Sequence, residues 1–322
     1  MMIRLLALAA LLFAPPAHAV VTIDWVTVGD PGNACDTQSQ GCFGSVAKSY
    51  RISKFEVTNA QYTEFLNAMA ATDTNGLYYI GMGSGFGGIT QSGSSPSFSY
   101  SVIAGFDDLP VNFVSFWSAT RFANWLHNGQ PTGLQGNTTT EDGAYTLTPT
   151  GITNNTITRN AAATIYVTSQ DEWYKAAYYK AGAMIYYDYP AGSDTLMTCP
   201  VPGPVANTAN CLGPDDVGDP TEVGSYTGSA SPNGTFDQGG NLWEWNEAVI
   251  GVSSRGKRGG SFKQFPALIA ASVRSNDLPS VEANNLGFRV ASTIAPVPSL
   301  SPAGILVLAA GLLGIFGLYR RR

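Results

Sequence analysis

Long polar stretches without a regular hydrophobic pattern are the feature that most limits how this chain can fold. Only 12% of its 322 residues are charged, whereas glycine, serine, threonine and asparagine are plentiful. Residues 81–101, 130–158 and 182–240 are of this kind, and we expect loops there, with short strand-like pieces such as residues 144–147. Such a chain needs restraints beyond hydrophobic burial, for example disulfides, packed aromatic rings or bound cations.

Three short segments have the pattern of amphipathic helices. Residues 58–69 begin with a threonine that can cap the first turn, and four apolar side chains then fall on one face. Residues 115–126 supply tryptophan and phenylalanine side chains for packing. Residues 169–179 begin with Ser169 and Glu172, which have the spacing of a capping box. We therefore expect a loop-rich α+β domain with few short helices.

The first nineteen residues have the composition of a signal peptide. A basic start at Arg4 precedes an apolar run over residues 5–14, and the triplet ending at Ala19 has the small-x-small form of a cleavage site. We expect cleavage after Ala19 and export of the remaining chain. Residues 20–294 then form one large domain. All 23 acidic residues lie in it, and four of the 17 basic ones lie outside it, which argues against a nucleic acid partner.

The last twenty-eight residues, 295–322, have the composition of a sorting tail. A proline-rich spacer precedes an apolar stretch over residues 303–319. As a helix, this stretch is roughly 26 Å long, close to the ~30 Å of a hydrocarbon core, and we expect it to span a membrane. Three terminal arginines favour a cytoplasmic end. The alternative is a buried C-terminal helix, although such a helix seldom lacks a polar face.

This tail resembles bacterial tails of the PEP-CTERM and IPTL-CTERM kind. The resemblance rests on the spacer, the short apolar span and the basic end. It implies recognition by an exosortase-type membrane protease. It also implies a location in the envelope, on the outer surface or in the extracellular matrix of a Gram-negative bacterium, with the tail either cut or kept as an anchor.

Four cysteines form two close pairs along the sequence, Cys35 with Cys42 and Cys199 with Cys211. In an exported chain we expect two disulfides, each closing a short loop. Metal ligation is the alternative. However, no two cysteines have the CxxC spacing, and His127 is the only histidine after residue 19. Thiolate zinc sites and multi-histidine iron sites are therefore disfavoured.

Six motifs follow one another along the domain. In chain order they are FEVTNAQYTEFLNA (55–68), LPVNFVSFWSATRFANWL (109–126), VTSQDEWYKAAYY (167–179), GGNLWEWNEA (239–248), RGGSF (258–262) and NLGFRVA (285–291). Together they resemble the sulfatase-modifying-factor, or formylglycine-generating-enzyme, domain over about residues 21–292. The resemblance implies a C-type-lectin-like fold, an irregular α+β domain with short helices and twisted antiparallel strands.

Some motif residues have a structural explanation of their own. On a strand, Trp243 and Trp245 alternate with Leu242 and Glu244, so we expect the two tryptophans to be a core pair. Arg289 is expected to be a structural ion-pairing group.

Oxygen-bearing residues at two places fit calcium, which prefers hard oxygen ligands. The resemblance implies a first site from two side chains and two carbonyls, at Asp237, Gly240, Leu242 and Glu244. It implies a second site, again mixing side chains with carbonyls, at Asn210, Cys211, Asp215 and Val217. The alternative is a pair of solvated acidic loops.

The family's catalytic position decides the expected function. The resemblance implies that formylglycine generation uses two cysteines after the GGS turn, which bind copper(I) as thiolates. Here residues 263–269 follow that turn without a cysteine, and no cysteine follows Cys211. The three-histidine site of the iron-dependent sulfoxide synthase relatives cannot be built from His127 alone. We therefore expect no copper, no catalytic residue and no enzyme activity.

The leading hypothesis is a calcium-stabilised module that binds a ligand or has a structural role. Its binding face would include residues 262–269 and 276–284, and its ligand could be a glycan, a matrix polymer or a protein. One alternative is an oxidoreductase of the formylglycine-generating type that acts on sulfatase-like or other proteins through an unrecognised site. The others are a different hydrolytic activity and a purely structural matrix component.

Overall fold

α-Helix is confined to four segments in the computed structural model, which describes residues 19–294. They are α1 (Asn59–Met69), α2 (Phe116–His127), α3 (Pro149–Thr153) and α4 (Gln170–Tyr178). Three of them confirm the predicted helices. Thr58 caps α1 and Ser169 caps α4, each in a capping box, while Ser115 caps α2. α3 lies in a stretch predicted to be loop, and a proline in its first turn favours its start.

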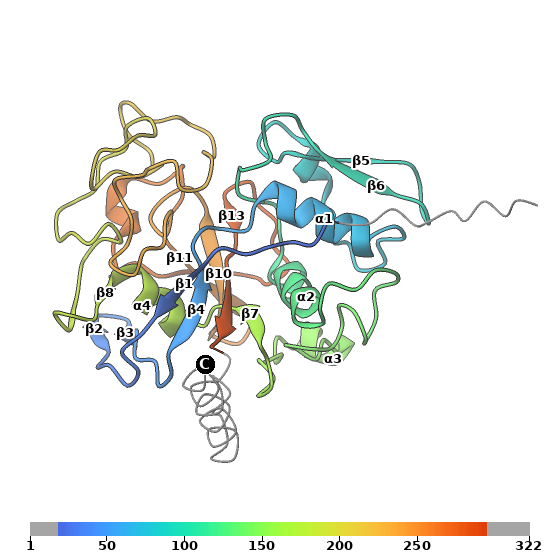
Figure 1. The fold of residues 1–322 in the computed structure, drawn as a ribbon, viewed down its shortest axis with the longest axis horizontal. Helices are drawn as coiled ribbons and strands as arrows, with labels where there is room; N and C mark the ends of the chain where they lie inside the picture. The colour runs from blue at the N-terminus through green and yellow to red at the C-terminus, as the bar shows by residue number, and fades with distance from the viewer. Residues whose placement is uncertain (1–18, 295–322) are drawn as a thin grey trace, which may run out of the picture.

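Two four-stranded sheets lie at the centre of the domain (Figure 1). The first is antiparallel, in the order β1 (Trp25–Val28), β4 (Tyr50–Ser53), β14 (Val290–Thr293) and β7 (Ile165–Val167). The second has the order β12 (Ser275–Asp277), β11 (Ser254–Arg258), β10 (Trp243–Ile250) and β13 (Leu286–Gly287). Its only parallel pair is β10 with β13. The first sheet therefore joins the two ends of the domain.

Three hairpins complete the described strands. They pair β2 (Asp36–Gln38) with β3 (Gly41–Phe43), β5 (Ile89–Ser92) with β6 (Ser99–Val102), and β8 (Tyr179–Lys180) with β9 (Ile185–Tyr186). The β5–β6 hairpin corrects the prediction of a loop over residues 81–101. Ile89 and Tyr100 are buried there, and they anchor an otherwise polar pair of strands. Residues 144–147 form no strand, since Tyr145 makes only an isolated bridge to Arg159.

Aromatic rings fill the core between α1, α2 and the sheets. The ring centroid of Phe122 in α2 lies 5.4 Å from that of Phe65 in α1 and 5.4 Å from that of Phe288, and both pairs are edge-to-face. Trp243 and Trp245 of β10 belong to the same core, which confirms the predicted tryptophan pair. Such rings bury large apolar areas, and they compensate for the small amount of regular structure.

Both predicted disulfides are present, Cys35–Cys42 and Cys199–Cys211. The second braces the long excursion over residues 182–240, which has no named helix or strand between β9 and β10. Two disulfides are typical of a protein outside the cytoplasm.

Two 3₁₀ turns are also present. η1 (Ile80–Gly83) precedes β5, and η2 (Pro266–Ile269) follows the GGS turn. Within residues 19–294, no helix is long and apolar enough to cross a membrane. The predicted sorting tail (295–322) and, except for Ala19, the predicted signal peptide (1–19) lie outside the described part of the chain.

Candidate functional site

A buried ion pair lies where three of the six sequence motifs meet. Arg289 donates from Nε and Nη2 to the two carboxylate oxygens of Glu244 at 2.5 and 2.7 Å, and both side chains are completely buried. Trp173 of α4 adds a hydrogen bond from Nε1 to Glu244 at 2.7 Å. Arg289 is thus the structural ion-pairing group that the sequence predicted, and three sequence motifs meet at Glu244.

Two further carboxylates lie near this pair. Glu56 is buried and accepts hydrogen bonds from Asn241 Nδ2 at 2.7 Å and from the Leu242 amide at 3.2 Å. Burial, and then the charges of Asp237 and Glu244, raise the pKa of Glu56 well above its usual range. Burial also raises the pKa of Asp237 to about 6, although the Gly224 amide donates to this carboxylate at 2.6 Å.

One guanidinium therefore faces three carboxylates in this acid cluster, which we define as Glu56, Asp237, Glu244 and Arg289. When all three acids are ionised, the cluster has an excess of negative charge in a region with little access to water. An added cation, or protons on Glu56 and Asp237, would compensate that excess.

The residues of the first predicted calcium site surround this cluster. Asp237 and Glu244 belong to it, and Gly240 and Leu242 lie in the buried turn between them. Gly240 has a φ of +81°, and a Cβ there would lie 2.2 Å from the Asn210 carbonyl oxygen. Only glycine allows the two backbones to approach so closely. The two predicted calcium sites are therefore neighbours.

The second predicted site is only partly assembled. Asn210 is buried and donates from Nδ2 to the Asp219 carbonyl and to Asn241 Oδ1, at 2.9 and 3.0 Å. Its Oδ1 is buried without a hydrogen-bond partner in the described chain. Cys211 is buried in its disulfide, whereas Val217 is 37% exposed and Asp215 lines a neighbouring groove.

Comparison with known proteins gives the family. The model of the sulfatase-modifying factor enzyme 1-like domain matches residues 36–294. The chain belongs to this family. No curated protein matches the chain significantly.

Several solved structures are similar to the chain at low identity. The crystal structure of CarF is 22% identical, with 85% of this chain and 99% of CarF covered and a TM-score of 0.56. Variable protein 1 of Treponema denticola is 16% identical, with 84% and 95% covered and a TM-score of 0.46. PvdO from Pseudomonas aeruginosa is 16% identical, with 84% and 92% covered and a TM-score of 0.48.

The segment after the GGS turn, where the sulfatase-modifying-factor resemblance places catalytic cysteines, offers no sulfur ligand. Gln264 is tied down there, since its carbonyl accepts from the Leu212 amide at 2.8 Å and its side chain bonds to Ser261. Ile269 is fully buried at the end of η2. All four cysteines are closed in disulfides, and the described chain contains no free cysteine.

A largely apolar groove of about 660 Å³ lies beside this segment. Residues 197–200, 212–215 and 265–266 line it, and Phe265 is 63% exposed at its edge. Lys263 Nζ donates to Asn284 Oδ1 at 2.9 Å, so the two segments expected to form a binding face are in contact.

Glu56 is a member of the acid cluster that was not predicted from the sequence. The residue lies in the first motif, but its hydrogen-bond partners are 185 and 186 positions away along the chain. The sequence did contain one indication of a buried role for Glu56, because this lone carboxylate stands between the apolar residues Phe55 and Val57.

Proposed function

We propose that this domain is a non-catalytic member of the sulfatase-modifying-factor family that serves as a calcium-stabilised ligand-binding or structural module. The observation that carries the proposal is the state of its sulfur atoms. Two disulfides use all four cysteines, and residues 263–269 contain none. A copper(I) centre of two thiolates, as the family resemblance implies for catalysis, therefore has no ligands.

The binding face that we propose consists of residues 262–269 and 276–284 together with the apolar groove. Its support is the Lys263–Asn284 contact, the exposed ring of Phe265 and the groove volume of about 660 Å³. Loops held on a rigid scaffold commonly carry binding function. The proposed ligand is a glycan, a matrix polymer or a protein, and not a nucleic acid.

Calcium is proposed as a stabilising ion because the residues offer it oxygens and, when all three acids are ionised, an excess of negative charge, although residues 19–294 contain no preassembled group of three metal-binding side chains. Within residues 19–294, the buried Asn210 Oδ1 has no hydrogen-bond donor, and the acid cluster has three carboxylates for one guanidinium. Each of the two sets of residues predicted above would hold its own ion, and at the first site Glu244 would be shared with Arg289. When bound, the ion supplies positive charge and cross-links the loops that contain Asn210 and Asp237.

Export and sorting complete the proposal. The disulfides support a location outside the cytoplasm. We propose that residues 1–19 direct export. We also propose that an exosortase-type protease recognises residues 295–322. Residues 303–319 would anchor the protein in the membrane, either until the protease cuts the tail or permanently if it does not. Mass spectrometry of secreted and membrane-bound protein distinguishes a cut tail from a retained one.

Glycan and protein arrays probed with residues 20–294 test the binding role. We expect a discrete set of ligands whose signal falls when Phe265→Ala removes the exposed ring. The matched control is Leu134→Ala, because Leu134 is 75% exposed on a loop that lines neither the groove nor the second cavity described below. Array signals that fall equally in both variants would refute the proposed face, and an array without any ligand would leave only the structural role.

A further inference from the structure

A second cavity, of about 560 Å³, lies between the β2–β3 and β8–β9 hairpins. These hairpins lie together beside α4 (Figure 1). The lining comes from residues 30–36, Tyr179 and residues 184–186. It shares no residue with the apolar groove or with the acid cluster.

Aromatic rings and apolar side chains form one part of the cavity lining. The ring centroids of Tyr179 and Tyr186 are 4.8 Å apart, and that of Tyr174 lies 5.6 Å from Tyr186. Met184 and Ile185, at the β8–β9 hairpin, are 77% and 44% exposed. These groups can cover the methylenes of a ligand, and tyrosine rings also attract cations to their faces.

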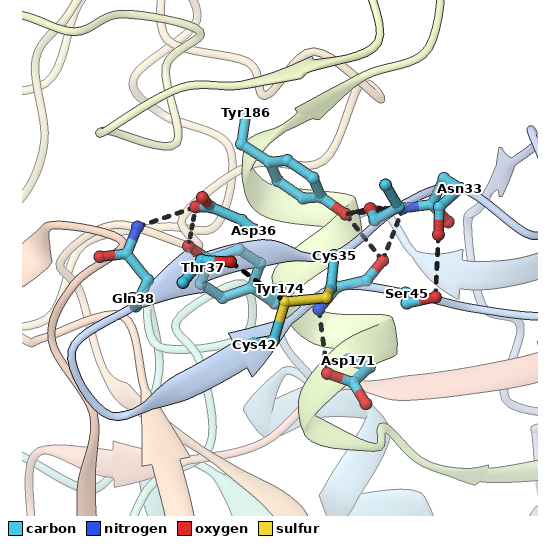
Figure 2. The surroundings of a disulfide bond; sticks show 12 residues. Asn33, Cys35, Asp36, Thr37, Gln38, Cys42, Ser45, Asp171, Tyr174 and Tyr186 are labelled. Carbon is cyan, nitrogen blue, oxygen red and sulfur yellow. Dashed lines mark hydrogen bonds between the residues drawn. A yellow bond between two sulfur atoms is a disulfide. The ribbon is translucent and has the colours of Figure 1, made fainter.

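The side-chain hydrogen-bond donors of this lining are all used within the protein. Tyr186 Oη lies 3.0 and 2.9 Å from the carbonyl oxygens of Ala34 and Gly44, and it accepts a bond from Asn33 Nδ2 at 2.6 Å. Tyr179 donates its hydroxyl to Asp30. Figure 2 shows the network around Tyr186 beside the Cys35–Cys42 disulfide. The lining therefore has no free side-chain donor for a ligand that needs one.

Carboxylate acceptors, in contrast, remain available. Asp36 uses one oxygen, Oδ2, to accept from Tyr174 at 2.6 Å and from Gln38 at 2.8 Å. Asp30 likewise accepts the Tyr179 proton on Oδ2. The Oδ1 atoms of both residues have no donor within residues 19–294. The nearby cation, Lys175, is buried, donates to the main-chain carbonyl of Asp30 at 2.6 Å and lies 5.5 Å from the Tyr179 ring centroid, so it takes one face of Tyr179 but neither carboxylate.

We propose that this cavity binds a primary alkylammonium group. An ammonium has three donors and no acceptor, which complements a lining with free carboxylate oxygens and no free side-chain donor. The attached methylenes would lie against Tyr186 and Ile185. A neutral alcohol lacks the charge and a carboxylate ligand would be repelled. The inference goes beyond the proposed function, because the site lies on different loops and needs neither calcium nor the apolar groove.

The Cys35–Cys42 disulfide holds one wall of the site in place. Cys35 lines the cavity next to Asp36, and the disulfide closes the β2–β3 hairpin, whose Phe43 packs on Tyr174 of α4. Both cysteines are exposed, unlike Cys199 and Cys211. Selective reduction of this hairpin should therefore weaken amine binding while the rest of the domain stays folded.

Isothermal titration of the purified protein tests the proposal, with 1,5-diaminopentane and an Nα-acetyl-lysine amide as separate probes. Saturable binding of either supports an alkylammonium site, and the tighter of the two identifies a free amine or a protein lysine as the source. We expect Asp30→Asn and Asp36→Asn each to weaken binding about tenfold, since a charge-assisted hydrogen bond becomes a neutral one. The amide of Asp36→Asn keeps an acceptor for Tyr174, so the fold should survive.

The matched control is Asp107→Asn, which removes the same charge from an exposed loop elsewhere. It should leave the affinity unchanged. The proposal would be overturned if 1-pentanol bound with the same affinity as the amine. It would also be overturned if Asp107→Asn weakened binding as much as Asp36→Asn. It would also be overturned if a variant with both Asp30 and Asp36 changed to Asn, with an unchanged melting temperature, kept the full affinity.

Discussion

Replacement of Arg289 by methionine should destabilise the domain strongly while it keeps a side chain of similar length. The change removes two charge-assisted hydrogen bonds to Glu244, which is completely buried. It also removes donors to the Ser53 and Phe236 carbonyls, at 3.1 and 2.9 Å. Loss of one partner of a buried ion pair typically costs about 3–5 kcal/mol, because the other charge stays buried without compensation.

The expected change in melting temperature follows from this cost. A domain of this size loses about 2–4 °C for each kcal/mol, so the melting temperature of Arg289→Met should fall by roughly 6–20 °C. Differential scanning calorimetry in the presence of a chelator measures the change without a contribution from bound ions. The control is the double variant Arg289→Met with Glu244→Gln, in which both charges are absent.

The double variant should recover a large part of the lost stability, because no unpaired charge is buried in it. A single variant within about 0.5 kcal/mol of the natural protein, the range typical of surface changes, would refute the role given to Arg289. If the double variant is instead less stable than Arg289→Met, then the unpaired charge of Glu244 is not what destabilises the single variant.

Three further predictions concern neighbouring parts of the structure. The pKa values of Asp237 and Glu56 are raised in the folded state, so their contribution to stability is greatest below their usual pKa values. In the presence of a chelator, unfolding titrations should therefore show the free energy of unfolding falling as pH rises through about 6, and added Ca²⁺ should suppress this fall. An identical pH profile with and without Ca²⁺ would exclude the ion. Trp173→Phe keeps an aromatic ring but removes the donor to Glu244, so the free energy of unfolding measured in urea should fall by about 1.5–3 kcal/mol. A change below about 0.5 kcal/mol, the usual range for surface substitutions, would show that this hydrogen bond is unimportant. Replacement of Cys199 and Cys211 together by serine should cost about 3 kcal/mol, the loop entropy of a separation of 12 residues, and an unchanged denaturation midpoint would contradict that restraint.

Local features of the fold were predictable from the sequence because their causes are local. The capping boxes at Thr58 and Ser169 involve residues three positions apart, and both form. The disulfides close short loops, and their pairing follows from spacing along the chain. The β5–β6 hairpin was not predictable in the same way, because Ile89 and Tyr100 reveal their inward positions only when the two strands pair.

The candidate site shows the same division. Arg289 was expected to form an ion pair, but its partner Glu244 was assigned to calcium, since nothing local indicates which carboxylate a distant arginine contacts. Glu56 received no role because it meets Asn241 and Leu242 only in the folded chain. Asp237 and Glu244 both belong to the acid cluster, while calcium binding there stays a prediction.

A copper(I) titration coupled to a peptide assay tests the non-catalytic role most directly. The purified protein would be incubated with copper(I), oxygen and a cysteine-containing sulfatase-type peptide, and mass spectrometry would follow conversion of the cysteine to an aldehyde. Because residues 263–269 supply no thiolate and the four cysteines are in disulfides, we predict no tight copper binding and no aldehyde. Stoichiometric copper(I) binding together with aldehyde formation would contradict this role and establish an oxidoreductase.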